Sequence, residues 1–314
     1  MQPILLYLIE PPRLLIYGLF LSAIWVQSRG REKMRFARTM GDLGTLAAPY
    51  NALVYLTSKT PNRPYLDETH FPEMQVIKDN WQLFREEGMR LRAEGATHGA
   101  VSENTDIAFD SFYRRGWTSF YITWYGHPLP SAQRLCPKSV ELLSSVPTIK
   151  GALFANLPAG SFLGRHRDPF AGFVRYQVAL DTPNSDDCWI SVDGEKRSWR
   201  DGQVMIFDET YVHEVRNDTD KDRLVLFCDV ERPVAAPMRP INRLFLKLVM
   251  GSSGTQNEPG EKVGALNTFY GWISGFHGWL KQIKLTNRRL YYAQKWAALA
   301  LLAAIFLAPW PAFI

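Results

Sequence analysis

Residues 203–230, QVMIFDETYVHEVRNDTDKDRLVLFCDV, decide the fold that we expect for this chain. The runs 203–207 and 223–230 are short and rich in β-branched and aromatic residues, and polar turns separate them from a third run at 213–217. Such runs predict β-strands. The upstream segments 148–157, 173–181, 188–192 and 196–199 have the same character, and Asp193-Gly194 is a typical hairpin turn. Short strands in series predict a mainly β fold, a jelly roll or double-stranded β-helix.

Helices are expected on the flanks of these strands. Residues 77–94 place apolar side chains on one side of a helix, and residues 131–145 predict a short helix that ends before Pro147. The apolar segment 43–56 is interrupted by Pro49 and is too short to cross a bilayer. Residues 117–125 predict one more strand.

A candidate metal site lies within the strand-rich region. His166 and Asp168 are two positions apart, so in a strand both would face one side, and His213 opens a later strand that can lie opposite. Two imidazoles and one carboxylate suit Fe(II), and they leave one face of the metal open for O₂ and a co-substrate. In the alternative interpretation, His166 and Asp168 are surface residues of a loop before Pro169.

Two arginines could complete this site. Arg223 opens the strand 224–229, and Arg175 lies in the strand 173–181. A guanidinium that points into the barrel needs an anion, because an unpaired buried charge is costly. A dicarboxylate co-substrate could supply one through a two-pronged contact. The alternative for each arginine is a salt bridge to an aspartate of the chain.

The composition allows a packed core and points to a membrane surface. The chain has 314 residues, 46% apolar and 21% charged, with a net charge of +5. Basic clusters at 29–38 and 281–295 each border an apolar run, which favours a membrane over nucleic acid. Cys136, Cys188 and Cys228 form no CxxC motif, and we expect reduced thiols, buried at least for Cys188 and Cys228.

Residues 14–28 and 296–314 lack charged side chains and are candidate membrane spans. The basic residues beside them place the body of the protein on the cytoplasmic side. A signal peptide and an interfacial helix are the alternatives for the N-terminal segment. We therefore expect an N-terminal anchor and apolar segment at 1–57, a catalytic domain at 58–235, an amphipathic and linker region at 236–295, and a C-terminal anchor at 296–314.

Three stretches carry a resemblance to a known family. They are FPEMQVIKDNW at 71–81, PAGSFLGRHRDPFAGFVRYQVAL at 158–180, and residues 199–233. The chain resembles the aspartyl/asparaginyl β-hydroxylase family of Fe(II)/2-oxoglutarate dioxygenases. Within that family the pattern is most similar to bacterial membrane enzymes that hydroxylate lipid A, a similarity that includes PYNAL at 49–53 and the apolar ends.

The resemblance implies a role for each candidate residue. His166, Asp168 and His213 would hold the iron, Arg223 would bind the distal carboxylate of 2-oxoglutarate, and Arg175 would assist at its other carboxylate. Two positions depart from the peptide hydroxylases of the family. Those enzymes have a glycine in place of Asp168, and Ala155 replaces a serine that helps them to bind the co-substrate.

The resemblance also implies a substrate. We expect hydroxylation of C2 of a secondary acyl chain of lipid A, or of a lipopolysaccharide precursor in the bilayer, at the cytoplasmic face of a bacterial inner membrane. A membrane-tethered peptidyl aspartyl/asparaginyl β-hydroxylase is the first alternative. A non-catalytic jelly-roll module that binds a metal or ligand at the membrane is the second, and the presence of His166, His213 and Arg223 together argues against it.

Overall fold

The computed structural model describes residues 11–35, 42–97 and 116–269, with a few further residues at 39, 113 and between 271 and 301. Most of the expected C-terminal anchor at 296–314, and much of the expected amphipathic and linker region after residue 269, lie outside the described residues.

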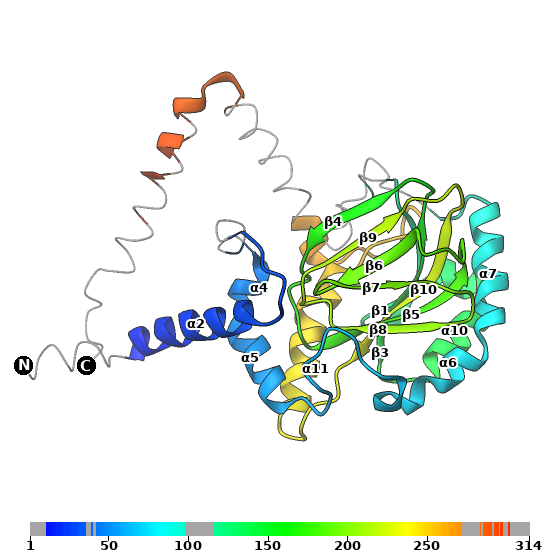
Figure 1. Ribbon diagram of the computed structural model, residues 1–314, viewed down its shortest axis with the longest axis horizontal. Helices are drawn as coiled ribbons and strands as arrows, with labels where there is room; N and C mark the ends of the chain where they lie inside the picture. Colours follow the sequence, from blue (N-terminus) through cyan, green and yellow to red (C-terminus); the bar gives the residue numbers. More distant parts are fainter. Residues whose placement is uncertain are drawn as a thin grey trace, which may run out of the picture.

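Two antiparallel sheets form the centre of the molecule (Figure 1). The larger sheet has the order β2 (His127–Pro128), β1 (Thr118–Trp124), β3 (Ile149–Leu157), β10 (Arg223–Glu231), β5 (Phe173–Asp181) and β8 (Val204–Phe207). The smaller has the order β4 (Phe162–His166), β9 (His213–Asn217), β6 (Cys188–Val192) and β7 (Glu195–Ser198). Between β3 and β10 the chain alternates between the sheets, except at the β6–β7 hairpin within the smaller sheet, which is the pattern of a jelly roll. The expected mainly β fold with flanking helices is confirmed.

The core lies along the two central strands of the larger sheet. Every residue of β5 and β10 is buried. Helix α7 (Trp81–Ala93) packs against both strands. Gly88 permits this close approach, because a Cβ at that position would lie 2.9 Å from the Phe154 ring and 3.3 Å from Leu224. All three cysteines are free and buried, as expected for Cys188 and Cys228.

The predicted hairpin turn is confirmed and has a second function. Asp193 and Gly194 have φ angles of 54° and 84°, as a two-residue turn between β6 and β7 requires. The Asp193 carboxylate also accepts hydrogen bonds from the backbone N–H groups of Arg31 and Glu32, at 2.7 and 2.8 Å. The turn therefore fixes the N-terminal segment to the smaller sheet.

Two predicted helices are each divided in the structure. Residues 77–94 form α6 (Gln75–Asp79) and α7, and the chain breaks at Asn80, whose side-chain amide donates to the Val76 carbonyl at 2.8 Å. Residues 131–145 form α9 (Pro130–Leu135) and α10 (Pro137–Ser144), because Pro137 cannot continue the first helix. Short 3₁₀ turns, η1 (Glu68–His70) and η2 (Pro72–Met74), precede α6.

A second group of helices lies on the side of the sheets away from α7 (Figure 1). It comprises α2 (Pro11–Ser28), α4 (Leu43–Leu46), α5 (Ala48–Thr57) and α11 (Met238–Val249), with the turn η3 (Gly251–Ser253) after α11. Helix α5 contacts α2, α4 and α11. None of the helices in the described part of the chain has both the length and the apolar character that a bilayer crossing needs.

The expected linker after α11 packs on the domain. Asn257 is buried, its amide oxygen accepts from the backbone N–H of Tyr121, and its amide nitrogen donates to the Tyr121 carbonyl. The distances are 2.8 and 2.7 Å. The segment is therefore held against the edge of the larger sheet rather than extending away from it.

Candidate metal centre and active site

The three predicted metal ligands come together at one end of the smaller sheet. Strand β4 ends at His166 and β9 begins at His213, and these two residues are paired in register. Their ring centroids are 4.1 Å apart. One potential ligand atom each from His166, Asp168 and His213 lies within 4.8 Å of the others. Elsewhere in residues 11–269, as far as they are described, no second cluster of this kind occurs.

The structural reason for this arrangement differs from the one that we expected. Asp168 lies two residues beyond the end of β4, so the alternation of side chains along a strand does not place it. Its backbone N–H donates to the Glu209 carbonyl at 2.9 Å. Asn51 of α5 donates to the Pro169 carbonyl at 2.8 Å and accepts from the Ala171 N–H at 2.9 Å. A braced loop therefore positions the carboxylate.

Both imidazoles are oriented by backbone carbonyls. Nδ1 of His166 donates to the Gly164 carbonyl at 2.8 Å, and Nδ1 of His213 donates to the Tyr211 carbonyl at 3.0 Å. Because a carbonyl can only accept, the proton lies on Nδ1 and the ring lone pair on Nε2. Burial, and then the neighbouring His166, lower the pKa of His213 to about 3, so this imidazole is neutral at physiological pH.

Asp168 supplies the negative charge of the cluster. Burial alone would raise its pKa, but His213, His166 and Arg175 together lower the pKa below its ordinary value. The Arg175 guanidinium lies 3.1 Å from the carboxylate. Two nitrogen donors and one carboxylate are the ligand set that suits non-haem Fe(II). The residues present therefore fit the metal that the sequence implied.

Arg175 points inward, as predicted, but the protein itself provides its anions. Its guanidinium forms ion pairs with Asp168, Glu209 and Asp229. Burial would lower the pKa of Arg175, and these three carboxylates outweigh burial and raise it. The salt-bridge alternative thus describes what the structure shows. Contact with a co-substrate stays a prediction, in which Arg175 would share its guanidinium with these groups.

Arg223 has the opposite surroundings. Its side chain is fully buried, and none of its three guanidinium nitrogens has a hydrogen-bond partner among the described residues. The guanidinium lies 4.3 Å from the ring centroid of Trp199 and 5.0 Å from that of Trp117. Burial lowers the pKa of Arg223 to about 10, so the group remains a cation at neutral pH. A cation in this position requires an anion that none of the described residues supplies.

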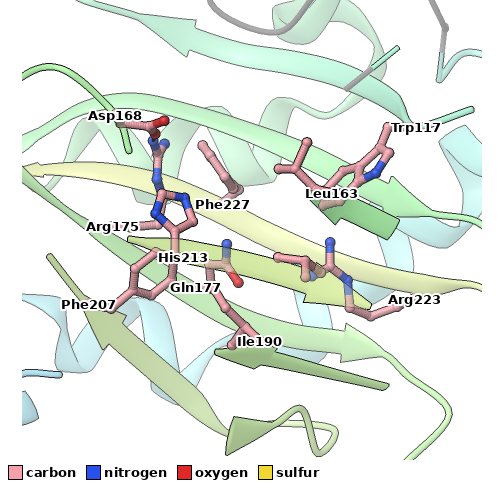
Figure 2. Close-up of a pocket in the computed structure, with 11 residues that line it drawn as sticks. Trp117, Leu163, Asp168, Arg175, Gln177, Ile190, Phe207, His213, Arg223 and Phe227 are labelled. Carbon is pink, nitrogen blue, oxygen red and sulfur yellow. Dashed lines mark hydrogen bonds and ion pairs between the residues drawn. The ribbon is translucent and has the colours of Figure 1, made fainter. Parts of the chain in front are cut away.

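One cavity joins Arg223 to the metal cluster (Figure 2). Asp168, Arg175 and His213 lie at one end, Arg223 lies at the other, and Gln177 lies between them. The space between its lining residues, open solvent included, is about 320 Å³. A small molecule could therefore contact a metal and the Arg223 guanidinium at the same time.

Three features of the site were not predicted. Glu209 is fully buried, is ion-paired with Arg175, and has a pKa raised well above its ordinary value, chiefly by burial. The sequence around Glu209 is typical of an exposed turn and does not indicate that this side chain is buried. Asp229 is directly opposite Arg175 in the strand register, a pairing that the sequence alone does not reveal. Ser119 is directly opposite Ala155, the position where the resemblance places a serine in the peptide hydroxylases. The Ser119 hydroxyl is hydrogen-bonded to Tyr113 at 2.6 Å.

The N-terminal helices brace the other ligand-bearing loop. Asp208 lies in the loop before His213 and is paired with Arg29, at the end of α2, at 3.4 Å. Tyr55 of α5 is hydrogen-bonded to Thr210 in the same loop. The described part of the expected N-terminal anchor is thus packed against the loop that leads to His213.

Comparisons with known proteins identify similar sequences. The family profile of aspartyl/asparaginyl beta-hydroxylase matches residues 78–233. An ornithine lipid ester-linked acyl 2-hydroxylase of Rhizobium tropici is 30% identical over 197 residues, which are 62% of this chain and 69% of that protein. Human aspartyl/asparaginyl beta-hydroxylase is 26% identical over 180 residues, 55% of this chain but only 23% of that protein. A Pseudomonas putida prolyl-4-hydroxylase structure has 21% identity and a TM-score of 0.32, over 49% of this chain and 87% of that one.

Proposed function

We propose a substrate and a set of residue roles from one premise: this chain belongs to the aspartyl/asparaginyl β-hydroxylase family and is an Fe(II)- and 2-oxoglutarate-dependent dioxygenase. The proposed reaction is hydroxylation at C2 of a secondary acyl chain of lipid A, at the cytoplasmic face of a bacterial inner membrane. Membrane attachment through the apolar helices is part of the proposal.

His166, Asp168 and His213 are the proposed iron ligands. The two Nε2 atoms and the Asp168 carboxylate are the donors, and the backbone carbonyls at Nδ1 hold the rings in place. When bound, iron and 2-oxoglutarate insert one atom of O₂ into a C–H bond, while the other atom enters succinate as CO₂ is lost. Arg175 holds the Asp168 carboxylate in position through its ion pair.

Arg223 carries the proposal for the co-substrate. It is a fully buried cation without a hydrogen-bond partner among the described residues, and it ends the cavity that begins at the metal cluster. A carboxylate of 2-oxoglutarate at this position would give the guanidinium its missing acceptors. The rings of Trp117 and Trp199 flank the guanidinium and exclude water from the contact, which strengthens it.

Two observations support a lipid rather than a peptide as the substrate. The Rhizobium relative bears the name of a hydroxylase that acts on the acyl chain of a lipid. Large apolar side chains are also exposed along α2 and α11, including Leu15, Leu21, Leu244 and Leu248. Contiguous exposed apolar surface of this kind marks a protein or membrane contact.

A product assay with three candidate substrates tests the proposal. Purified protein is supplied with Fe(II), 2-oxoglutarate and either lipid A, ornithine lipid or an acidic peptide. We expect lipid A to gain one oxygen atom in step with succinate formation. Hydroxylation of ornithine lipid alone would overturn the choice of lipid, and hydroxylation of the peptide alone would favour the peptidyl β-hydroxylase. The variants His166→Ala and His213→Ala serve as controls, and both should be inactive.

A further inference from the structure

A second, larger cavity adjoins the candidate metal centre. Asp168 and Arg175 line both this cavity and the smaller one that leads to Arg223. The larger cavity has a volume of about 1220 Å³, including the space at its open mouth. The two cavities therefore meet at the proposed iron ligand. Since the smaller cavity is assigned to the co-substrate, the larger one is left for the molecule that is oxidised.

The walls of the larger cavity are apolar except at the metal end. Its charged groups are the ion-paired cluster around Arg175. Away from this cluster the cavity is lined by Ser253, whose hydroxyl donates to the Met250 carbonyl, and otherwise by apolar side chains, which include Trp124, Phe170, Phe173, Val249 and Met250. Such walls stabilise a hydrocarbon chain by removing its surface from water, by about 25 cal/mol per Å². An acidic peptide would instead lose hydration without gaining partners.

The mouth of this cavity lies on an apolar surface. Leu43 of α4 lines the cavity and is 55% exposed, so it marks the opening, and Val249 lines the cavity from the end of α11. Exposed leucines that do not line the cavity continue outward on both helices, Leu46 on α4 and Leu248 on α11. Figure 1 shows α4 and α11 within the helical group on one side of the sheets.

Helix α11 also has the composition of a helix that lies at a membrane surface. Ile241, Leu244 and Leu248 are exposed, while basic residues occur every fourth position, at Arg239, Arg243 and Lys247. An apolar stripe bordered by positive charge is attracted to anionic lipid. Arg243 is ion-paired with Glu231, so Arg239 and Lys247 supply the positive charge of this helix that matches a bilayer surface.

We infer that the larger cavity is the binding site for the acyl chain of the substrate, which enters from the bilayer between α4 and the end of α11. The target carbon lies at the Asp168 end, and the remainder of the chain lies along the walls formed by Phe170, Phe173 and Met250. This inference rests on the proposed function, because it assumes that an acyl chain is the group oxidised.

Binding of a fluorescent fatty acid, cis-parinaric acid, tests the site separately from catalysis. Val249→Trp fills the cavity and should weaken binding by about tenfold or more. Leu248→Trp is the matched control, because Leu248 is the adjacent residue, is 63% exposed and does not line the cavity. The control should bind the probe as the wild type does. The rise in Tm produced by 2-oxoglutarate should be unchanged in both variants, which shows that the smaller cavity is intact.

A second pair of variants addresses entry without disturbing the core. Leu43→Asp places a negative charge at the mouth, where it repels the carboxylate of the probe, and Leu46→Asp places the same charge on the same helix outside the cavity, at a residue that is 69% exposed. Only the first should weaken binding of the probe. Equal binding by all four variants and the wild type would overturn the inference, even if the wild type hydroxylates lipid A. Loss of binding in Val249→Trp and Leu43→Asp alone would uphold the acyl site, even if lipid A is not the lipid oxidised.

Discussion

Replacement of Arg223 by methionine should not destabilise the protein, although the residue is fully buried. The wild type buries three guanidinium nitrogens without acceptors among the described residues, and each unsatisfied polar group costs about 1–3 kcal/mol. An apolar side chain of similar volume removes this cost. The variant loses the contacts with Trp117 and Trp199, worth about 0.5–2 kcal/mol. We therefore expect the free energy of unfolding of the metal-free protein to be unchanged or up to about 3 kcal/mol higher.

Arg175→Met is the matched control, because Arg175 is also buried and also points inward. Its removal leaves Asp168, Glu209 and Asp229 without their common cation, and we expect a loss of about 3–5 kcal/mol. Urea denaturation of the two variants, without metal or 2-oxoglutarate, measures the difference. A destabilisation of Arg223→Met as large as that of Arg175→Met would refute the reasoning, since it would show that Arg223 already has protein partners.

The same variant has a second expected result in the presence of ligand. With a catalytically inert divalent metal, 2-oxoglutarate at a hundred times its Kd should stabilise the wild type by about 2.7 kcal/mol. Arg223→Met should show no such stabilisation at that concentration. Arg223→Met should thus lose the stabilisation by 2-oxoglutarate although the free energy of unfolding of the metal-free variant is not reduced.

Three further substitutions test other parts of the structure. Loss of a residue that only hydrogen-bonds to a metal ligand typically weakens metal binding by roughly 10- to 100-fold. Asp168→Gly removes a proposed ligand itself and should therefore weaken Fe(II) binding by more than this, as measured by metal titration. Burial alone would raise the pKa of Asp208, but Arg232 and Arg29 lower it, so its stabilising effect is present at neutral pH and is lost on acidification. The stability difference between wild type and Asp208→Asn should therefore shrink as the pH falls below about 4, and a constant difference would contradict this. Gly88→Ala should destabilise by about 0–2 kcal/mol, because the clash with Phe154 outweighs the gain in helix propensity.

The strands and the metal ligands could be predicted because their signals are local. Alternating and β-branched runs specify β5, β6 and β10, and the spacing of His166, Asp168 and His213 specifies a ligand set. The breaks at Asn80 and Pro137 are also local, and the second follows directly from the proline, which cannot continue a helix.

The remainder depends on contacts between distant segments. Whether a buried arginine is paired within the protein depends on strand register and on loops, so Arg175 and Arg223 look alike in the sequence and differ in the structure. The burial of Glu209 and the bracing of Pro169 by Asn51 depend on tertiary packing in the same way. The apolar N-terminal segment predicts an affinity for lipid, but its sequence does not show that α2 and α5 pack against the loops that carry the ligands.

The fate of the oxygen atoms tests the central claim most directly. Purified protein is given Fe(II), 2-oxoglutarate, lipid A in detergent and isotopically heavy O₂, and the products are analysed by mass spectrometry. We expect one heavy atom in the new hydroxyl group of the acyl chain and one in succinate, in equal amounts, and neither product from His213→Ala. A hydroxyl oxygen that comes from water, or lipid oxidation that continues without 2-oxoglutarate, would contradict the account.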